Sequence, residues 1–297
     1  MTQLLIHIGP FKTGTTSFQN YMWGHREALL EQGVLYPKAG VFAQNFGARH
    51  LGLARAPKSK ADQAKVLENF GDLRREIAAN PKAEKVVLSA ERMSQRIPAL
   101  VSRKRFYEDY NPKLVVVVRD EVAMVRSMYF QIVKARFGLM KNDNTDDVKD
   151  FPRWFEGYKD KMSYPLMLQP WIDVFGADSI IFVPYEAHKK VNIITSLNDA
   201  MGLPHLEIGG KKGYQNPSIG GLAAAAAIYA ADYGLEQAKR GMEFAALLEA
   251  EHPEMKKMDP KGYDGDAMRA YYDAQNAPAF EMYPAFKKAH DAATSRD

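Results

Sequence analysis

The sequence contains no cysteine, and this absence removes several kinds of chemistry at once. Disulfide frameworks, thiolate zinc sites, iron–sulfur clusters and cysteine nucleophiles all need that side chain. A chain without cysteine also fits a reducing compartment, so we expect a cytoplasmic location. Any reaction must use other polar groups.

Long hydrophobic runs and a strong charge of one sign are also absent. No apolar run approaches the ~20 residues that a membrane-spanning helix requires, and the first run, residues 4–8, is too short for a signal-peptide core. The 40 Lys and Arg residues nearly balance the 36 Asp and Glu residues, which leaves a net charge of +4. This balance argues against a nucleic-acid partner and suits an anionic small ligand. We therefore expect neither a membrane span nor nucleic-acid binding.

Metal-ligand patterns are missing as well. The seven histidines are scattered, without an HExxH motif or another paired spacing. The segment from Asp143 to Asp147 faintly resembles a calcium loop, but Val148 stands at the glycine position and Trp154 at the glutamate position. We expect no metal site.

Short apolar runs alternate with helical patterns through the first two-thirds of the 297 residues. Nearly all-apolar runs are typical of strands that are covered on both faces, and they occupy residues 4–8, 85–89, 113–118 and 179–184. Helical patterns cover residues 16–32, 61–79, 94–109 and 121–136, with two more in 151–175. This alternation predicts an α/β fold, a parallel sheet flanked by helices.

The strands stop after Gly202, and the chain from Ser218 onward is rich in Ala, Met and Tyr with helical spacing. We expect an α/β core over residues 1–216 and a C-terminal helical extension over residues 217–297 that packs on it, as one domain overall. The Tyr- and Met-bearing helices offer a surface for a homo-oligomer.

Residues 6–19 read IHIGPFKTGTTSFQ and indicate an anion-binding loop. Gly9 and Gly14 have the spacing of a Walker-type loop, whose backbone amides hold phosphates. Lys12, however, precedes the second glycine instead of following it. Amides at the start of a helix favour negative charge, and Thr16 and Ser17 add hydroxyl donors. The alternative interpretation is an ordinary N-cap and first helical turn.

A second anion-binding element follows the predicted strand 113–118. Arg119 stands directly after this strand, and Ser127 comes eight residues later in the next helical pattern. Ligands of open α/β sheets bind at the carboxyl ends of strands, where an arginine can hold phosphate. The alternative for Arg119 is a surface ion pair with Asp120 or Glu121.

Together these motifs resemble those of sulfotransferases that depend on 3′-phosphoadenosine-5′-phosphosulfate (PAPS), whose fold is related to the P-loop kinases. The family's 5′-phosphosulfate loop reads approximately PKTGTTS, which is FKTGTTS at residues 11–17 here. Its 3′-phosphate motif has an arginine at a strand end, a serine eight positions on and then a tyrosine, matched by Arg119, Ser127 and Tyr129. Phe11 replaces the usual proline, and Glu121 stands where proline is common. Neither departure removes a phosphate-binding group.

The resemblance covers about the first 220 residues in motif order. It implies a P-loop NTPase-like sulfotransferase fold and sulfuryl transfer from PAPS, without a metal, to a hydroxyl or amine of a small-molecule, carbohydrate or lipid acceptor. Residues 209–220, GGKKGYQNPSIG, resemble the segment of the family that covers the cofactor. The implied cofactor-binding residues are Lys12, Thr13, Gly14, Thr15, Thr16, Ser17, Arg119, Ser127, Lys211, Lys212 and Gly213.

The same resemblance implies three catalytic residues. Lys12 would stabilise the leaving phosphate, and Glu91, just past the predicted strand 85–89, would be the general base. The alternative interpretation is that Glu91 caps the next helix or forms an ion pair with Arg92. His50 is the competing base, because other branches of the family use a histidine, although a lone histidine is more often structural.

Two other functions remain open from the sequence. A P-loop nucleotide-dependent kinase or NTPase shares this fold but needs a Walker-B aspartate. The predicted strands 85–89 and 113–118 lead instead to Ser89 and Arg119. A non-catalytic protein that binds adenosine 3′,5′-bisphosphate is the second alternative. Such a protein has no need of a base at Glu91.

Overall fold

The structure is a computed structural model that describes residues 2–44, 47–54, 57–95, 109–110, 112–138, 146–186, 191–207 and 220–295. The chain forms two compact units. The first contains residues 1–120, 164–215 and 276–297, and the second contains residues 121–163 and 216–275.

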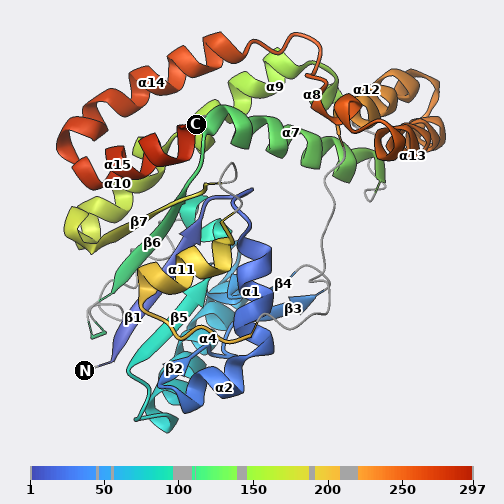
Figure 1. Ribbon diagram of the computed structural model, residues 1–297. Helices are drawn as coiled ribbons and strands as arrows, with labels where there is room; N and C mark the ends of the chain where they lie inside the picture. Colours follow the sequence, from blue (N-terminus) through green and yellow to red (C-terminus); the bar gives the residue numbers. More distant parts are fainter. Residues whose placement is uncertain are drawn as a thin grey trace. The chain divides into compact units, whose positions relative to one another are not determined.

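A five-stranded parallel sheet forms the centre of the first unit (Figure 1). Its order is β2-β5-β1-β6-β7, and every neighbouring pair is parallel. The bounds are β1 Gln3–Gly9, β2 Val34–Leu35, β5 Lys85–Ser89, β6 Lys113–Val118 and β7 Ile180–Pro184. The four longer strands match the predicted runs and confirm the α/β class.

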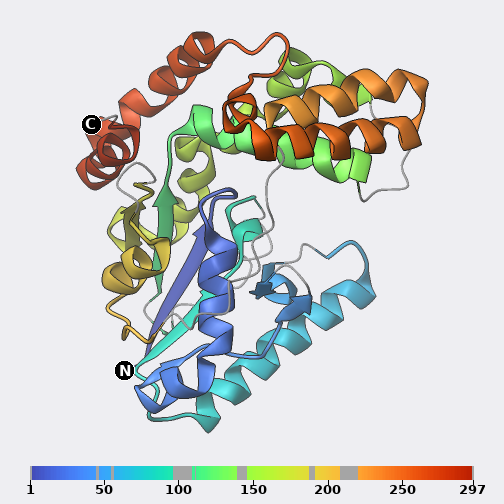
Figure 2. The same cartoon turned by 45° about the vertical axis from the view of Figure 1, so that its right-hand side comes forward.

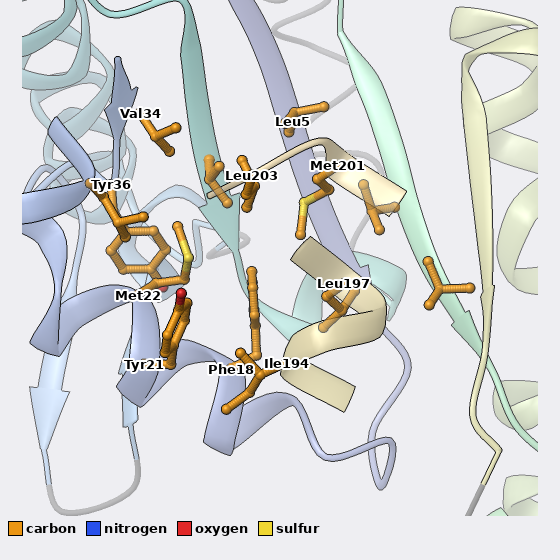
Figure 3. Packing of buried hydrophobic residues seen from close by; sticks show 14 of the residues in the cluster. Leu5, Phe18, Tyr21, Met22, Val34, Tyr36, Ile194, Leu197, Met201 and Leu203 are labelled. Carbon is orange, nitrogen blue, oxygen red and sulfur yellow. The ribbon is translucent and has the colours of Figure 1, made fainter. Parts of the chain in front are cut away.

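Helices cover both faces of this sheet, as the last strand shows. Val183 belongs to the apolar cluster that contains Ile194 of α11 (Ile193–Met201) and Phe18 of α1 (Thr15–Gly24), part of which Figure 3 shows. The adjacent Phe182 faces the other way, with its ring centroid 5.4 Å from that of Phe286 in α15 (Pro284–Thr294). Successive side chains of a strand alternate between faces. The sheet is therefore the middle layer of three.

The remaining elements of the first unit are short, except for one. They are α2 Arg26–Glu31, the hairpin of β3 Phe42–Gln44 and β4 Gly47–Arg49, α3 Leu51–Ala54, η1 Glu91–Gln95, α10 Tyr164–Phe175 and η3 Ala177–Ser179. The long α4, Lys60–Ala79, begins where the Ser59 side chain accepts a hydrogen bond from the Asp62 amide. It buries Val66, Phe70, Leu73 and Ile77 at helical spacing.

The second unit is helical throughout its described residues. It contains α7 Glu121–Gly138, α8 Asp146–Lys149, α9 Phe151–Tyr158, η2 Lys159–Met162, α12 Gly221–Ala230, η5 Ala231–Tyr233, α13 Leu235–Glu251, η6 Pro253–Lys257 and α14 Gly265–Met282 as far as Gln275. Figure 2 shows α12, α13 and α7 side by side. Aromatic residues of α9 pack on one another, and the ring centroids of Trp154 and Tyr158 are stacked 4.7 Å apart.

The structure differs from one prediction of local structure and confirms another. The single helix expected over residues 16–32 is divided, because α1 ends at Gly24 and α2 begins at Arg26. The helical character of the chain beyond Ser218 is confirmed from Gly221 onward. Most of the predicted helix 94–109 and all of the segment with Lys211, Lys212 and Gly213 lie outside the described residues.

Candidate functional site

The candidate site lies at the carboxyl ends of β1 and β6. The chain leaves central strand β1 for edge strand β2 on one side, and it leaves β6 for β7 on the other. Open α/β sheets bind ligands where the connections from neighbouring strands diverge in this way. The loop after β1 and Arg119 after β6 are therefore in the expected place for ligand binding.

Backbone geometry shapes the loop that joins β1 to α1. Gly9 has φ +99°, and a Cβ added there would lie 3.0 Å from the Glu91 Cα atom. Gly14 has φ +75° and precedes the first residue of α1, with no side chain capping the helix. Lys12 also has a positive φ, 69°, which is uncommon for a residue with a side chain. Glycine adopts positive φ values without strain, so Gly9 and Gly14 fit this loop, whereas Lys12 is strained.

The four hydroxyl groups of this loop are not equivalent. Thr13 is buried and donates a hydrogen bond of 2.8 Å to the Pro10 carbonyl. Thr15 is buried and donates one of 2.6 Å to Glu91 Oε1. Thr16 is half-buried, and Ser17 is exposed. A ligand at this helix start would therefore meet backbone amides and these outer hydroxyls, while Thr13 and Thr15 shape the loop from within.

Arg119 joins the two strand ends. Its guanidinium donates a hydrogen bond to the Lys12 carbonyl and lies over the Tyr185 ring, 5.1 Å from the centroid. Its own amide donates to the Tyr164 hydroxyl at 2.7 Å. Burial lowers the pKa of Arg119 from its ordinary value, although neighbouring tyrosines and Asp120 oppose that shift. A largely desolvated cation thus stands beside the loop, where an anion would be strongly attracted.

Ser127 and Tyr129 lie on α7, in the second unit. Ser127 is half-buried. Tyr129 is buried, donates a hydrogen bond of 2.7 Å to the Val148 carbonyl and packs edge-on against the Phe151 and Trp154 rings. Tyr129 is therefore a core residue of its unit. The joint use of Arg119 and Ser127 stays a prediction.

Glu91 begins η1, just past β5, and is only 4% exposed. One carboxylate oxygen, Oε1, accepts the Thr15 hydrogen bond. The other, Oε2, is buried and has no hydrogen-bond partner in the part of the chain that the structure describes. A buried polar atom without a partner costs free energy and points to a ligand or water. One anchored oxygen and one uncommitted oxygen suit a carboxylate that takes up a proton.

His50 has a different environment from the one expected of a base. It is fully buried, its Nδ1 accepts a hydrogen bond from the Ser89 amide at 3.1 Å, and its Nε2 lies 3.0 Å from the Pro37 carbonyl. Burial lowers its pKa to about 4, against smaller opposing effects of these backbone bonds. Because both ring nitrogens are bonded to backbone groups, this geometry favours a structural role for His50.

Three polar residues beside Glu91 were not among the predicted site residues. His7 Nδ1 lies 2.8 Å from Ser89 Oγ, which also accepts a hydrogen bond of 3.1 Å from Gln19 Nε2. All three side chains are fully buried. The signal in the sequence was His7 itself, a polar residue within an otherwise apolar strand. Its pairing with Ser89 depends on strand register, which the sequence does not display.

The part of the chain that the structure describes lacks two features. No cluster of three or more His, Cys, Asp or Glu side chains there could hold a metal ion. None of the helices there combines the length and apolar character needed to cross a bilayer.

Comparison with known proteins gives a match among solved structures. No protein-family model matches the chain, and no curated protein matches it. Among solved structures, the chain is similar to the crystal structure of a sulfotransferase from Alicyclobacillus acidocaldarius, with 16% identity and a TM-score of 0.39. The match covers 71% of this chain and 87% of that one.

Proposed function

We propose that this protein is a PAPS-dependent sulfotransferase that moves a sulfuryl group to a hydroxyl or amine and releases adenosine 3′,5′-bisphosphate. The observation that carries the proposal is the hydrogen bond from Arg119 to the Lys12 carbonyl. It joins the two elements that are predicted to bind anions on neighbouring parallel strands, and so supports a ligand with phosphates at both ends. The FKTGTTS loop and the arginine at the strand end are the motifs in which the sequence resembles PAPS-dependent sulfotransferases.

The residues at the loop fit such a donor. The start of α1 has no side-chain cap, and its Ser17 amide donates to the Gly14 carbonyl, so the amides of Thr15 and Thr16 are the ones that would meet a 5′-phosphosulfate oxygen. Lys12 and these amides would stabilise charge on the departing phosphate. Arg119 and Ser127 would hold the 3′-phosphate, and Lys211, Lys212 and Gly213 would cover it. When bound, the donor supplies a sulfuryl group that carries less charge than a terminal phosphoryl group, so this mechanism uses no metal.

Glu91 would act on the acceptor. Its Oε2 would receive the proton that the acceptor hydroxyl or amine loses as the new bond to sulfur forms and the bond from sulfur to the phosphate oxygen breaks. The Thr15 hydrogen bond at Oε1 would keep the carboxylate oriented during this step. The acceptor class remains a small molecule, a carbohydrate or a lipid.

The P-loop kinase or NTPase alternative differs at one position. A Walker loop has its lysine directly after the second glycine, and that place is taken by Thr15, whose hydroxyl bonds Glu91. A thermal-shift comparison separates the two functions, because a ligand stabilises the protein that binds it. We expect stabilisation by adenosine 3′,5′-bisphosphate without magnesium. Stabilisation only by ATP with magnesium, and not by the bisphosphate, would refute the proposal. Transfer of labelled sulfate from PAPS to a panel of acceptors then distinguishes an enzyme from a binding protein.

A further inference from the structure

A directional hydrogen-bond chain approaches Glu91 from inside the first unit. Gln19 Nε2 donates to Ser89 Oγ at 3.1 Å, and Ser89 Oγ lies 2.8 Å from His7 Nδ1. A serine hydroxyl that accepts one hydrogen bond still has its own hydrogen to donate. If that hydrogen is directed at Nδ1, a neutral His7 ring carries its proton on Nε2.

The Nε2 end of His7 is buried and has no partner among the described residues. The same is true of Glu91 Oε2. The two residues are close, because the His7 carbonyl accepts a hydrogen bond of 3.1 Å from the amide of Ala90, the residue before Glu91. With the proton on Nε2, a buried donor and a buried acceptor are left over in one small region, a combination that a single water can satisfy.

We propose that His7 is a positioning residue for Glu91, whose Oε2 it holds through one water molecule that accepts from His7 Nε2–H and donates to the carboxylate. A carboxylate oxygen has two lone-pair directions, so one remains for the acceptor proton. This catalytic meaning rests on the proposed function. The tautomer of His7 and its water-mediated link to Glu91 are independent of that function.

The surrounding charges are compatible with a neutral imidazole. Burial lowers the pKa of His7 to about 4, and the Glu91 carboxylate opposes that shift. Phe18 covers the ring edge-on at 5.6 Å and carries no charge. Two further titratable groups are nearby: Tyr36, whose pKa burial and Glu91 raise, and His50, whose pKa burial lowers. Both are neutral near pH 7, so Glu91 supplies the charge that acts on His7.

Nitrogen-15 NMR of histidine-labelled protein tests the link without any activity. The His7 signal is assigned by its loss in His7→Gln, and we expect the Nε2–H tautomer at pH 7. In Glu91→Gln the His7 ring signals should shift, while those of His25, a half-buried residue whose Nδ1 lies 2.9 Å from the Tyr21 carbonyl, should not. An Nδ1–H tautomer, or His7 signals unchanged by Glu91→Gln, would overturn the inference.

Kinetics test the catalytic meaning. His7→Gln can keep an N–H donor near the ε position, whereas His7→Asn reaches only the δ position. We expect kcat to fall about tenfold in His7→Asn, the scale of one hydrogen bond to a charged group, and His7→Gln to restore most of it.

Three outcomes are distinguishable. An unchanged kcat in His7→Asn, or a loss that His7→Gln does not recover, would overturn the positioning role. Equal thermal shifts with adenosine 3′,5′-bisphosphate in both variants and the wild type would show that donor binding is intact, so the kcat loss would support that role. If neither the wild type nor any variant binds the bisphosphate, the proposed function fails. The NMR result then decides by itself whether His7 is linked to Glu91.

Discussion

The Thr15 hydroxyl donates a hydrogen bond of 2.6 Å to Glu91 Oε1, and so ties the start of α1 to the segment after β5. Replacing Thr15 by Val keeps the shape of the side chain and removes this donor. We expect Thr15→Val to lower the free energy of unfolding by about 1–3 kcal/mol, because a buried acceptor loses its partner. Thr15→Ser should recover most of that loss in denaturant titrations. Equal destabilisation by both variants would contradict the assignment.

Arg119 is expected to matter for the bisphosphate more than for the fold. Arg119→Ala should weaken binding of adenosine 3′,5′-bisphosphate by about 100-fold, on the scale of a lost charge-assisted contact. Arg119→Lys should recover little, because an ammonium lacks the planar fork. Isothermal titration calorimetry measures both. Arg75→Ala, which removes an exposed ion pair with Asp72, is the matched control and should bind normally; unchanged affinity in Arg119→Ala would refute the role.

Lys12 allows its side chain and its backbone to be tested separately. Because φ is 69°, Lys12→Gly relieves backbone strain, whereas Lys12→Ala retains it. We expect both variants to lose about 100-fold in turnover, since leaving-group stabilisation comes from the ammonium. Their stabilities should differ, with Gly the more stable. Full activity of either variant in PAPS assays would show that the lysine does not assist the leaving group.

Gly14 is confined by a neighbour as well as by its backbone. A Cβ there would lie 2.9 Å from Ile193 Cγ2, with φ at +75°. Gly14→Ala should cost about 1–3 kcal/mol of stability and weaken bisphosphate binding. Adding Ile193→Ala removes the clash but not the strained φ, so the double variant should recover binding in part. If it binds no better than Gly14→Ala, the contact is not what limits the loop.

Stability should fall when the pH is lowered through the range where unfolded histidines become protonated. Burial lowers the pKa of both His7 and His50 from 6.5 to about 4. Between these values the unfolded chain binds more protons, so stability declines as the pH falls from 6.5 toward 4, by about 3 kcal/mol for each histidine. Urea titrations at pH 7 and pH 5 measure the decline. It should be smaller in His50→Gln, and an equal decline there would exclude His50 as a source.

Much of the sheet could be predicted because a strand covered on both faces must be apolar along its length. The runs at residues 85–89 and 113–118 show this pattern, and they became β5 and β6. β2 consists of Val34 and Leu35 alone, too short for any periodicity. The break between α1 and α2 after Gly24 was missed because the hydrophobic spacing continues through it. The break depends on the local backbone conformation, which hydrophobic spacing does not report.

The candidate site was predictable where chemistry lies in consecutive residues. The loop around Lys12 and the arginine after β6 could be identified because glycine spacing and a charge after an apolar run are local signals. The contrasting environments of Thr13 and Thr16 were not predictable, because burial depends on residues from distant strands. His50 illustrates the same limit, since its partners Pro37 and Ser89 come together only in the folded sheet.

The packing of α15 on β6 and β7 covers these strands with residues that are distant from them in the sequence. Phe286 of α15 packs on Phe182 of β7. A contact between residues so far apart closes a large loop of chain, and the entropy of loop closure is lost before the contact can stabilise the fold. Contacts of this kind slow folding, so the step that seats α15 on the sheet is one that local sequence cannot accelerate.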